Sequence, residues 1–235
     1  MGVVTIGCDV GQRVDPTAIA VCECEQPGKG QPDSFIVRHL ERLEIGTPYP
    51  DIAARIAAVY RGVVSRMTAR LSEEQTYKQA IGELRGYLRP DGVLWGEVAD
   101  SVSLLVDATG VGTPVVDLIR EQPGLEGVRL TGVFFTSGDR CSVSPGAREG
   151  SVGKAFLVSR LQSLLQYKRV RLPQTAEARA LADELLNYEI RVTADASMTA
   201  GAFKTGTHDD LVTALGLATL IDSRTCESGT IRGAR

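Results

Sequence analysis

Two short apolar segments, each ending in an aspartate and a glycine-containing turn, constrain the fold of this chain more than any other feature. The segment VVTIGCDVG ends at Asp9 and Gly11, and the segment SLLVDATGVG ends at Asp107, Gly110 and Gly112. Apolar runs of this length, bounded by turn residues, are typical of buried strands. In an open α/β sheet, ligands bind at the carboxyl ends of the strands. If the two strands are parallel neighbours, their aspartates therefore lie side by side.

The remaining sequence predicts one mixed α/β domain over residues 1–222, followed by a flexible tail over 223–235. Residues 17–25 and 34–43 are predicted to continue the first strand as a three-strand antiparallel meander, because short turns connect them. We expect a parallel strand at 128–138, a short extended segment at 169–173 and helices on both sides of the sheet. The predicted helices cover 51–88 with a break near Leu71 and Ser72, then 114–121, 152–168, 176–188 and a final segment after Asp210.

The segment KTGTHDDLVTALGLATLID places two adjacent acids, Asp209 and Asp210, before apolar residues at helical spacing. One aspartate at a helix start is a common cap, so the second needs another explanation. At about 100° per residue, Asp210 lies about 70° from the centre of the apolar face, whereas Asp209 points away from it. We therefore expect Asp210 to reach a metal ion over the strand ends. Asp209 is expected to cap the helix or to contact a second ion.

Asp9, Asp107 and Asp210 would repel one another and retain protons at such an edge unless a cation neutralised them. Oxygen ligands without cysteine or paired histidine favour Mg²⁺ or Mn²⁺ over zinc. Two such ions about 4 Å apart could activate a water molecule and stabilise the leaving oxygen of a phosphodiester. Taken singly, Asp9 or Asp107 fits a turn or a cap better than a metal ligand, and the three aspartates together reverse that preference. Asp15 and His208 are expected to contact the metal ligands, although Asp15 before Pro16 also fits a simple turn.

The charge distribution gives one candidate DNA-binding surface. The net charge of −3 does not indicate a globally basic nucleic-acid binder. However, no acid occurs between Lys154 and Arg171, a segment that includes Arg160, and Arg140 and Arg148 lie in the preceding Gly/Ser-rich loop. Cationic side chains beside an acidic metal site would attract a phosphate backbone, although a solvated helix face is the alternative. Lys154 is the strongest candidate, and we expect the loop to become ordered on DNA or a partner.

The order of these motifs resembles the nuclease domain of the terminase large subunit of tailed phages. The resemblance covers nearly the whole chain, and DATGVG and HDDLVTAL are its specific parts. It implies an RNase H-like fold and metal ligands at Asp9, Asp107 and Asp210, with Asp209 beside them. It also implies double-stranded DNA as substrate, cleavage of concatemeric viral DNA during packaging, and a packaging ATPase motor, a small terminase subunit and a portal as partners.

Other features set the context and leave alternatives open. The chain has no GxxxxGK[ST] motif, so we expect either an excised nuclease domain or a stand-alone nuclease, and the segment 70–92 has no assigned role. Five cysteines without a disulfide or zinc pattern, and the lack of a signal peptide or apolar span, predict a cytoplasmic protein that does not bind a membrane. The alternatives are an actin-like or sugar-kinase-type ATPase, a non-catalytic module that binds a packaging partner, and a Holliday-junction resolvase.

Overall fold

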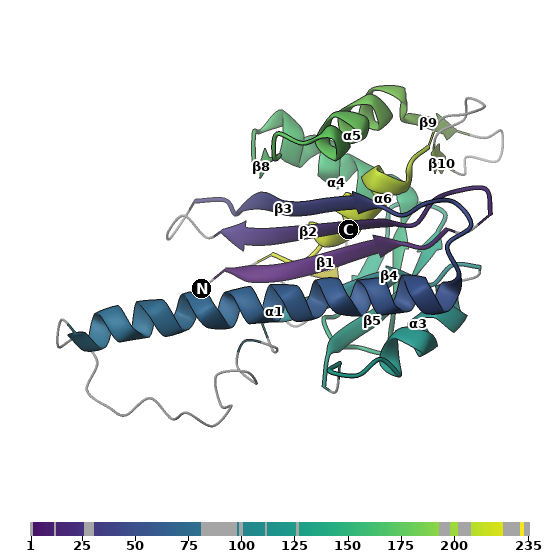
Figure 1. Ribbon diagram of the computed structural model, residues 1–235. Coiled ribbons are helices and arrows are strands. Elements are labelled where there is room, and N and C mark those ends of the chain that lie inside the picture. Colours follow the sequence, from purple (N-terminus) through teal and green to yellow (C-terminus); the bar gives the residue numbers. More distant parts are fainter. Residues whose placement is uncertain are drawn as a thin grey trace.

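The computed structural model describes residues 2–11, 13–25, 31–80, 98, 101–110, 112–125, 127–192, 198–201, 208–222 and 231–232. These residues form a mixed β-sheet with helices on both faces (Figure 1). The predicted fold class, an antiparallel meander joined to parallel strands and flanked by helices, is confirmed.

The main sheet has nine strands in the described part of the chain, in the order β11-β6-β7-β5-β4-β1-β2-β3-β8. A separate hairpin pairs β9 with β10 in antiparallel fashion. The strands are β1 (Val3–Asp9), β2 (Ala18–Glu25), β3 (Ser34–Arg42), β4 (Val102–Asp107), β5 (Arg129–Thr136), β6 (Cys141–Val143), β7 (Glu149–Gly153), β8 (Val170–Arg171), β9 (Glu189–Val192), β10 (Met198–Gly201) and β11 (Ile231–Arg232).

The pairing of β1 places the two strand-end aspartates at one edge. β1 is antiparallel to β2 on one side and parallel to β4 on the other. Cys8 of β1 is paired with Val106 of β4, so the next residues, Asp9 and Asp107, end neighbouring parallel strands at the same level. The sequence predicted that the two aspartates lie side by side if their strands are parallel neighbours. The strands are parallel neighbours, so this prediction is confirmed.

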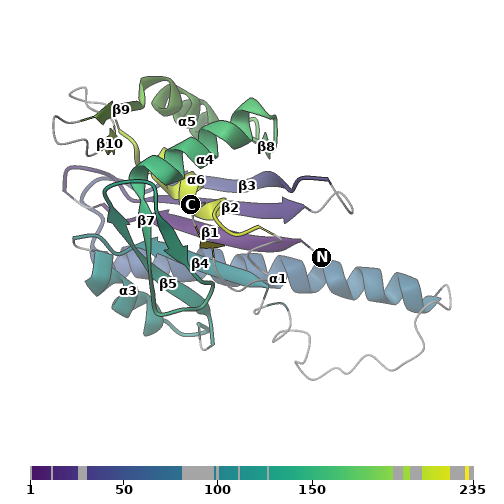
Figure 2. The same cartoon turned by 180° about the vertical axis from the view of Figure 1, so that it is seen from behind.

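Helices cover both faces of the sheet (Figures 1 and 2). On one face, α1 packs against α3, and their apolar side chains share a core with β1 and β4. On the other face, α6 lies directly on β1 and β2, and α4 and α5 pack against it. Every residue of α6 is buried, including the polar residues Asp210 and Thr213. The helices are α1 (Tyr49–Ala80), α3 (Gly112–Arg120), α4 (Lys154–Gln166), α5 (Ala176–Asn187) and α6 (Asp210–Ala218). No helix in the described residues combines the length and hydrophobicity of a membrane span.

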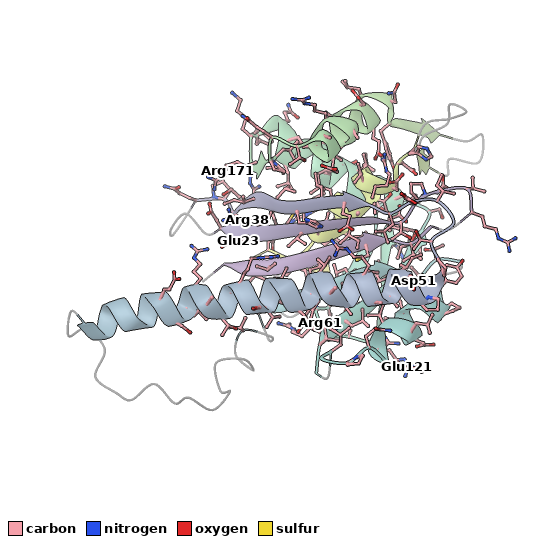
Figure 3. All side chains as sticks on the ribbon, viewed as in Figure 1. Glu23, Arg38, Asp51, Arg61, Glu121 and Arg171 are labelled. Atoms are coloured by element: carbon pink, nitrogen blue, oxygen red, sulfur yellow. The ribbon has the colours of Figure 1, made fainter. Side chains whose placement is uncertain are left out.

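Ion pairs join β2, β3 and α1. The register of β2 and β3 shifts between Val21 and Cys22, which leaves Arg38 without a directly opposite residue. The guanidinium of Arg38 lies 2.6 Å from the carboxylate of Glu23 on the neighbouring strand (Figure 3). Arg70 of α1 reaches the same carboxylate at 3.4 Å, so this group joins the helix to the sheet.

The predicted helix break near Leu71 and Ser72 is wrong, because α1 continues through both residues. The Ser72 hydroxyl donates to the carbonyl of Thr68 at 3.0 Å, so its side chain is accommodated within the helix. The predicted residues 81–88 of this helix lie outside the described ones.

Short strands were also missed in regions predicted as loop or tail. The Gly/Ser-rich segment 138–150 contains β6 and the start of β7, and residues 231–232 of the expected flexible tail form β11, which pairs with β6. β7 has low intrinsic strand propensity and is held by its parallel pairing with β5, a tertiary contact that sequence patterning does not detect.

Candidate functional site

A cleft of about 650 Å³ lies at the carboxyl ends of β1 and β4. It brings together five aspartates from three separate parts of the chain with one lysine and one arginine, and the loop after β1 supplies part of its wall. The lining residues are Asp9, Val10, Gly11, Arg13, Val14, Asp15, Tyr49, Asp107, Lys154, Asp209 and Asp210. The carboxylates that the sequence predicted as metal ligands therefore share one cleft.

Local backbone geometry orients Asp107. Its Oδ1 atom accepts a hydrogen bond from the backbone N–H of Thr109 at 2.8 Å, which is an Asx-type turn closed by the DATGVG segment. A Cβ atom on Gly112 would lie 1.9 Å from the carbonyl oxygen of Asp107. Only glycine allows α3 to begin this close to the end of β4, so this glycine maintains the turn that presents the carboxylate.

The cleft disfavours the ionised form of its own carboxylates. Burial raises the pKa of Asp9 well above its ordinary value, and the charges of Asp107, Asp209 and Asp210 raise it further, while Lys154 lowers it. Burial also raises the pKa of Asp107, against hydrogen bonds from Thr109 and the positive charge of Lys154. Lys154 and Arg13 in the cleft, with Arg42 on Asp210, do not balance the five aspartates that line it, so an additional cation would stabilise their ionised forms.

Asp209 differs from the prediction in its local geometry. It occupies the N-cap position of α6 with φ −132° and ψ 12°, and its side chain makes no capping hydrogen bond. Helical arithmetic does not apply to this residue, because it precedes the helix. Instead of pointing away, Asp209 lines the cleft and contributes to the raised pKa of Asp9. The predicted capping role is therefore wrong, and the alternative of a metal contact stays a prediction.

Asp210 is almost fully buried at the start of α6, and two residues that the sequence analysis did not identify surround it. Its Oδ2 atom accepts a hydrogen bond from Nε of Arg42 at 2.7 Å, and Arg42 also donates through Nη2 to Oε1 of Glu184. Glu184 Oε2 accepts from the backbone N–H of Val212 at 3.1 Å, so Glu184 supplies the cap that Asp209 does not. Burial raises the pKa of Glu184 to about 7, with Asp210 as the next contribution.

One sequence signal could have identified Glu184. It follows the buried residues Ala178 and Leu181 of α5 at intervals of three, on the face where helical spacing predicts an apolar side chain. A buried acid at such a position requires a partner. No comparable signal identifies Arg42, because it ends a strand where a charged residue is ordinary.

His208 lies between two of the predicted acids without a hydrogen bond to either, so its predicted contact with a metal ligand stays a prediction. Its Nδ1 atom lies 3.7 Å from Oδ1 of Asp15 and 3.8 Å from Oδ1 of Asp210. Both distances exceed a hydrogen bond. Among the described residues, His208 Nδ1 and Asp210 Oδ1 are buried atoms without a hydrogen-bond partner. Asp210 therefore has one oxygen held by Arg42 and one oxygen with no partner.

Two of the predicted DNA-binding residues lie near the cleft. Lys154 is the first residue of α4 and lines the cleft, with Nζ 5.4 Å from the centroid of the Phe135 ring. Arg140 is exposed, and its carbonyl oxygen accepts a hydrogen bond from the backbone N–H of Gly153 at 2.7 Å. The loop that carries Arg140 thus packs against the residue before Lys154.

The other two predicted DNA-binding residues are placed differently. Arg148 is exposed and lines a second cavity of about 360 Å³, which shares no lining residue with the cleft. Arg160 is directed into the protein, where its guanidinium donates to the carbonyl of Thr219 at 2.9 Å and lies 3.1 Å from Asp222. These contacts tie α4 to the end of α6 and do not favour a DNA contact by Arg160, whose predicted role stays a prediction.

The donor chemistry of the cleft fits a hard divalent cation, although the ligands are not preassembled. Carboxylates are the ligands that Mg²⁺ and Mn²⁺ prefer, and the unpartnered Oδ1 of Asp210 offers a buried acceptor. In the described part of the chain, however, no three histidine, cysteine or acidic side chains are close enough together to chelate one ion as placed. Ion binding would therefore require small side-chain movements at the strand ends.

Comparison with solved structures shows a shared fold. No protein-family model matches the sequence, and no curated protein gives a significant match. The large terminase nuclease of thermophilic phage G20c is 18% identical over 94% of this chain and 83% of its own, with a TM-score of 0.55. The same nuclease with bound magnesium is 21% identical over 92% and 80% of the two chains, with a TM-score of 0.51.

The nuclease domain of the Thermus phage P74-26 large terminase is 19% identical over 92% of this chain and 78% of its own, also with a TM-score of 0.51. At these identities the likeness establishes the fold alone. The resemblance to terminase nuclease domains, and with it the RNase H-like arrangement, is confirmed at that level.

Proposed function

We propose that this protein is a DNA endonuclease that uses two Mg²⁺ or Mn²⁺ ions to hydrolyse phosphodiester bonds, and that it cuts concatemeric viral DNA during genome packaging. The observation that carries the proposal is the convergence of Asp9, Asp107, Asp209 and Asp210 in one cleft with Lys154 beside them. The shared fold with large terminase nucleases, one of them with bound magnesium, supports it.

Each group in the cleft has a place in this chemistry. Asp9, Asp107 and Asp210, with Asp209, would hold the ions, which when bound supply charge neutralisation at the phosphate and an activated water. Lys154 is placed to bind a non-bridging phosphate oxygen beside the carboxylates. Because Lys154 is anchored against the Phe135 ring, it would orient the scissile phosphate with little loss of side-chain freedom.

The cationic groups around the cleft favour contact with the DNA backbone over base recognition. Arg13 lines the cleft from the loop after β1, and Arg140 follows the loop that packs on Gly153. Point contacts to phosphates position the duplex and carry no sequence information. We therefore expect unrelated linear duplexes to be cut at similar rates. Selection of a packaging site would come from partners, namely a packaging motor, a small terminase subunit and a portal.

A plasmid-nicking assay tests the proposal. Supercoiled DNA is incubated with the protein in Mg²⁺, Mn²⁺, Ca²⁺ or EDTA, and Asp107→Asn is compared with Asp117→Asn, an exposed aspartate paired with Arg120 away from the cleft. We expect cleavage in Mg²⁺ or Mn²⁺, none in EDTA, loss in Asp107→Asn and full activity in Asp117→Asn. Cleavage that survives chelation would contradict the metal requirement. A rise in melting temperature with ATP, without cleavage, would favour the ATPase alternative.

A further inference from the structure

Arg42 and Glu184 form a buried ionic link with Asp210 that joins three elements distant in sequence. Arg42 ends β3, Glu184 lies in α5 and Asp210 begins α6. The side chains of Glu184 and Asp210 are 7% and 3% exposed, and that of Arg42 is 30% exposed. Charges this well buried are held in place by their partners, so the geometry of the link fixes the start of α6.

Three of the four carboxylate oxygens in this link accept a hydrogen bond. Arg42 donates through Nε to Oδ2 of Asp210 and through Nη2 to Oε1 of Glu184. Glu184 Oε2 accepts the backbone N–H of Val212. Asp210 Oδ1 has no partner in the described residues, although it is buried and Asp210 lines the carboxylate cleft. An unpaired buried acceptor requires an explanation. Nδ1 of His208, which also has no partner among these residues, lies 3.8 Å away, too far for a hydrogen bond, and a bound ion would supply the missing partner.

We propose that Arg42 and Glu184 are positioning residues that hold Oδ2 of Asp210, so that Oδ1 is presented to a divalent cation in the cleft. The planar guanidinium donates in a fixed fork, and engaging both carboxylates at once prevents the Asp210 carboxylate from turning. Glu184 completes the fork and fixes the backbone of α6 through Val212. Groups behind the ligands commonly set metal affinity in this way. The inference rests on the proposed function only in taking the cleft as the metal centre.

The charge arrangement supports the same role. Arg42 carries the positive charge between Asp210 and Glu184, so the link brings one net negative charge to the cleft. Removal of Arg42 would leave two adjacent carboxylates without a counter-charge and would release Oδ2 of Asp210 from the hydrogen bond that holds it. A purely structural ion pair would stabilise the fold without setting the affinity for an ion.

Mn²⁺ binding to the whole chain, measured by electron paramagnetic resonance of the free ion, separates the two roles without depending on cleavage. We expect Arg42→Met to weaken Mn²⁺ binding by about 10- to 100-fold. Arg42→Lys should recover only part of the loss, because an ammonium group lacks the fork. The matched control is Arg38→Met, which removes an arginine of the same strand that pairs with Glu23 away from the cleft. It should leave the Mn²⁺ affinity unchanged.

Glu184→Gln keeps the shape of the side chain and is the second test variant if Arg42→Met does not fold. We expect it to lose less Mn²⁺ affinity than Arg42→Met. The proposal is overturned if folded Arg42→Met binds Mn²⁺ as tightly as the wild-type protein. If Arg42→Met does not fold, unchanged Mn²⁺ affinity of Glu184→Gln overturns it. An equal loss of Mn²⁺ affinity in Arg38→Met also overturns it. Failure of the proposed function is distinguishable: the wild-type protein would then bind Mn²⁺, and lose it on Asp9→Asn, without cutting DNA. In a protein that does cut DNA, cleavage by Arg42→Met should recover at raised Mn²⁺ concentration.

Discussion

Gly7 of β1 lies directly beneath Ala214 of α6. A methyl group built on Gly7 would stand 2.2 Å from the carbonyl oxygen of Ala214 and 2.5 Å from the backbone nitrogen of Ala218. The strand and the helix are therefore in contact through their backbones. Because Asp9 follows Gly7 by two residues and Asp210 begins the same helix, this close approach helps to bring the two acids into one cleft.

Gly7→Ala should destabilise the protein and disturb the cleft together. The added methyl group meets backbone atoms, which cannot rotate away, and overpacking of this kind costs about 1–3 kcal/mol. Displacement of α6 should also reduce the rise in melting temperature that Mn²⁺ produces in the wild-type protein. Both effects are measured by thermal denaturation with EDTA and with Mn²⁺.

Gly62→Ala is the matched control for this substitution. Gly62 lies in α1, and the nearest atoms to an added methyl group belong to the flexible end of the Arg66 side chain, at 3.6 Å or more. Alanine is favoured over glycine in a helix by about 1 kcal/mol, so this variant should be at least as stable as the wild-type protein. Equal stability of Gly7→Ala and Gly62→Ala would show that the α6 contact adapts freely.

Asp9→Asn should change the pH dependence of stability in the absence of metal. The folded pKa of Asp9 is raised, first by burial and then by Asp107, so the folded state keeps its proton to higher pH than the unfolded state. Its contribution to stability is therefore present at low pH and is lost as pH rises above the ordinary value of 3.8. The melting temperature of Asp9→Asn minus that of the wild type in EDTA should grow with rising pH.

The measurement is thermal denaturation in EDTA at several pH values between mildly acidic and mildly alkaline, with Asp117→Asn as an exposed control. Mn²⁺ should reverse the order, because only the wild-type protein gains the full set of ligands. A constant difference would mean that the carboxyl of Asp9 is ionised in the folded protein without cost, and a difference that shrinks as the pH rises would mean that folding lowers its pKa.

Lys154→Met should weaken DNA binding and reduce its salt dependence by about one counterion. The variant keeps the apolar contact with Phe135 while removing the positive charge from the cleft. Lys168→Met is the control, because Lys168 is an exposed lysine just beyond the other end of α4. The binding constant is measured for each protein by fluorescence anisotropy of a labelled duplex in Ca²⁺ over a range of salt concentrations. The slope of its logarithm against the logarithm of the salt concentration is then compared between the proteins. Identical slopes for Lys154→Met and the wild-type protein would mean that Lys154 makes no contact with a DNA phosphate.

The sequence predicted the parts of the site that depend on local pattern. The strands ending at Asp9 and Asp107 are short apolar runs closed by turn residues, and both end where expected. Their parallel pairing could only be stated as a condition, because it depends on contacts between residues far apart in the chain. β6, β7 and the hairpin of β9 and β10 were missed because tertiary pairing holds short polar segments extended.

The link of Arg42, Glu184 and Asp210 could not be read from the sequence for a related reason. Arg42 and Asp210 are separated by 168 positions, and a charged residue at the end of a strand carries no signal of its distant partner.

Asp210→Ala and Asp209→Ala should differ in their effects on cleavage and on stability. Asp210 takes part in the buried link, so Asp210→Ala should abolish cleavage and cost about 1–3 kcal/mol through the lost hydrogen bond to a buried partner. Asp209 makes no capping hydrogen bond, so Asp209→Ala should leave the melting temperature close to that of the wild type. It should retain measurable cleavage with a weaker response to Mn²⁺, because it removes one charge from the cleft. If Asp209→Ala is inactive and Asp210→Ala cuts DNA, then Asp209 holds the ion and the link to Arg42 only anchors the helix.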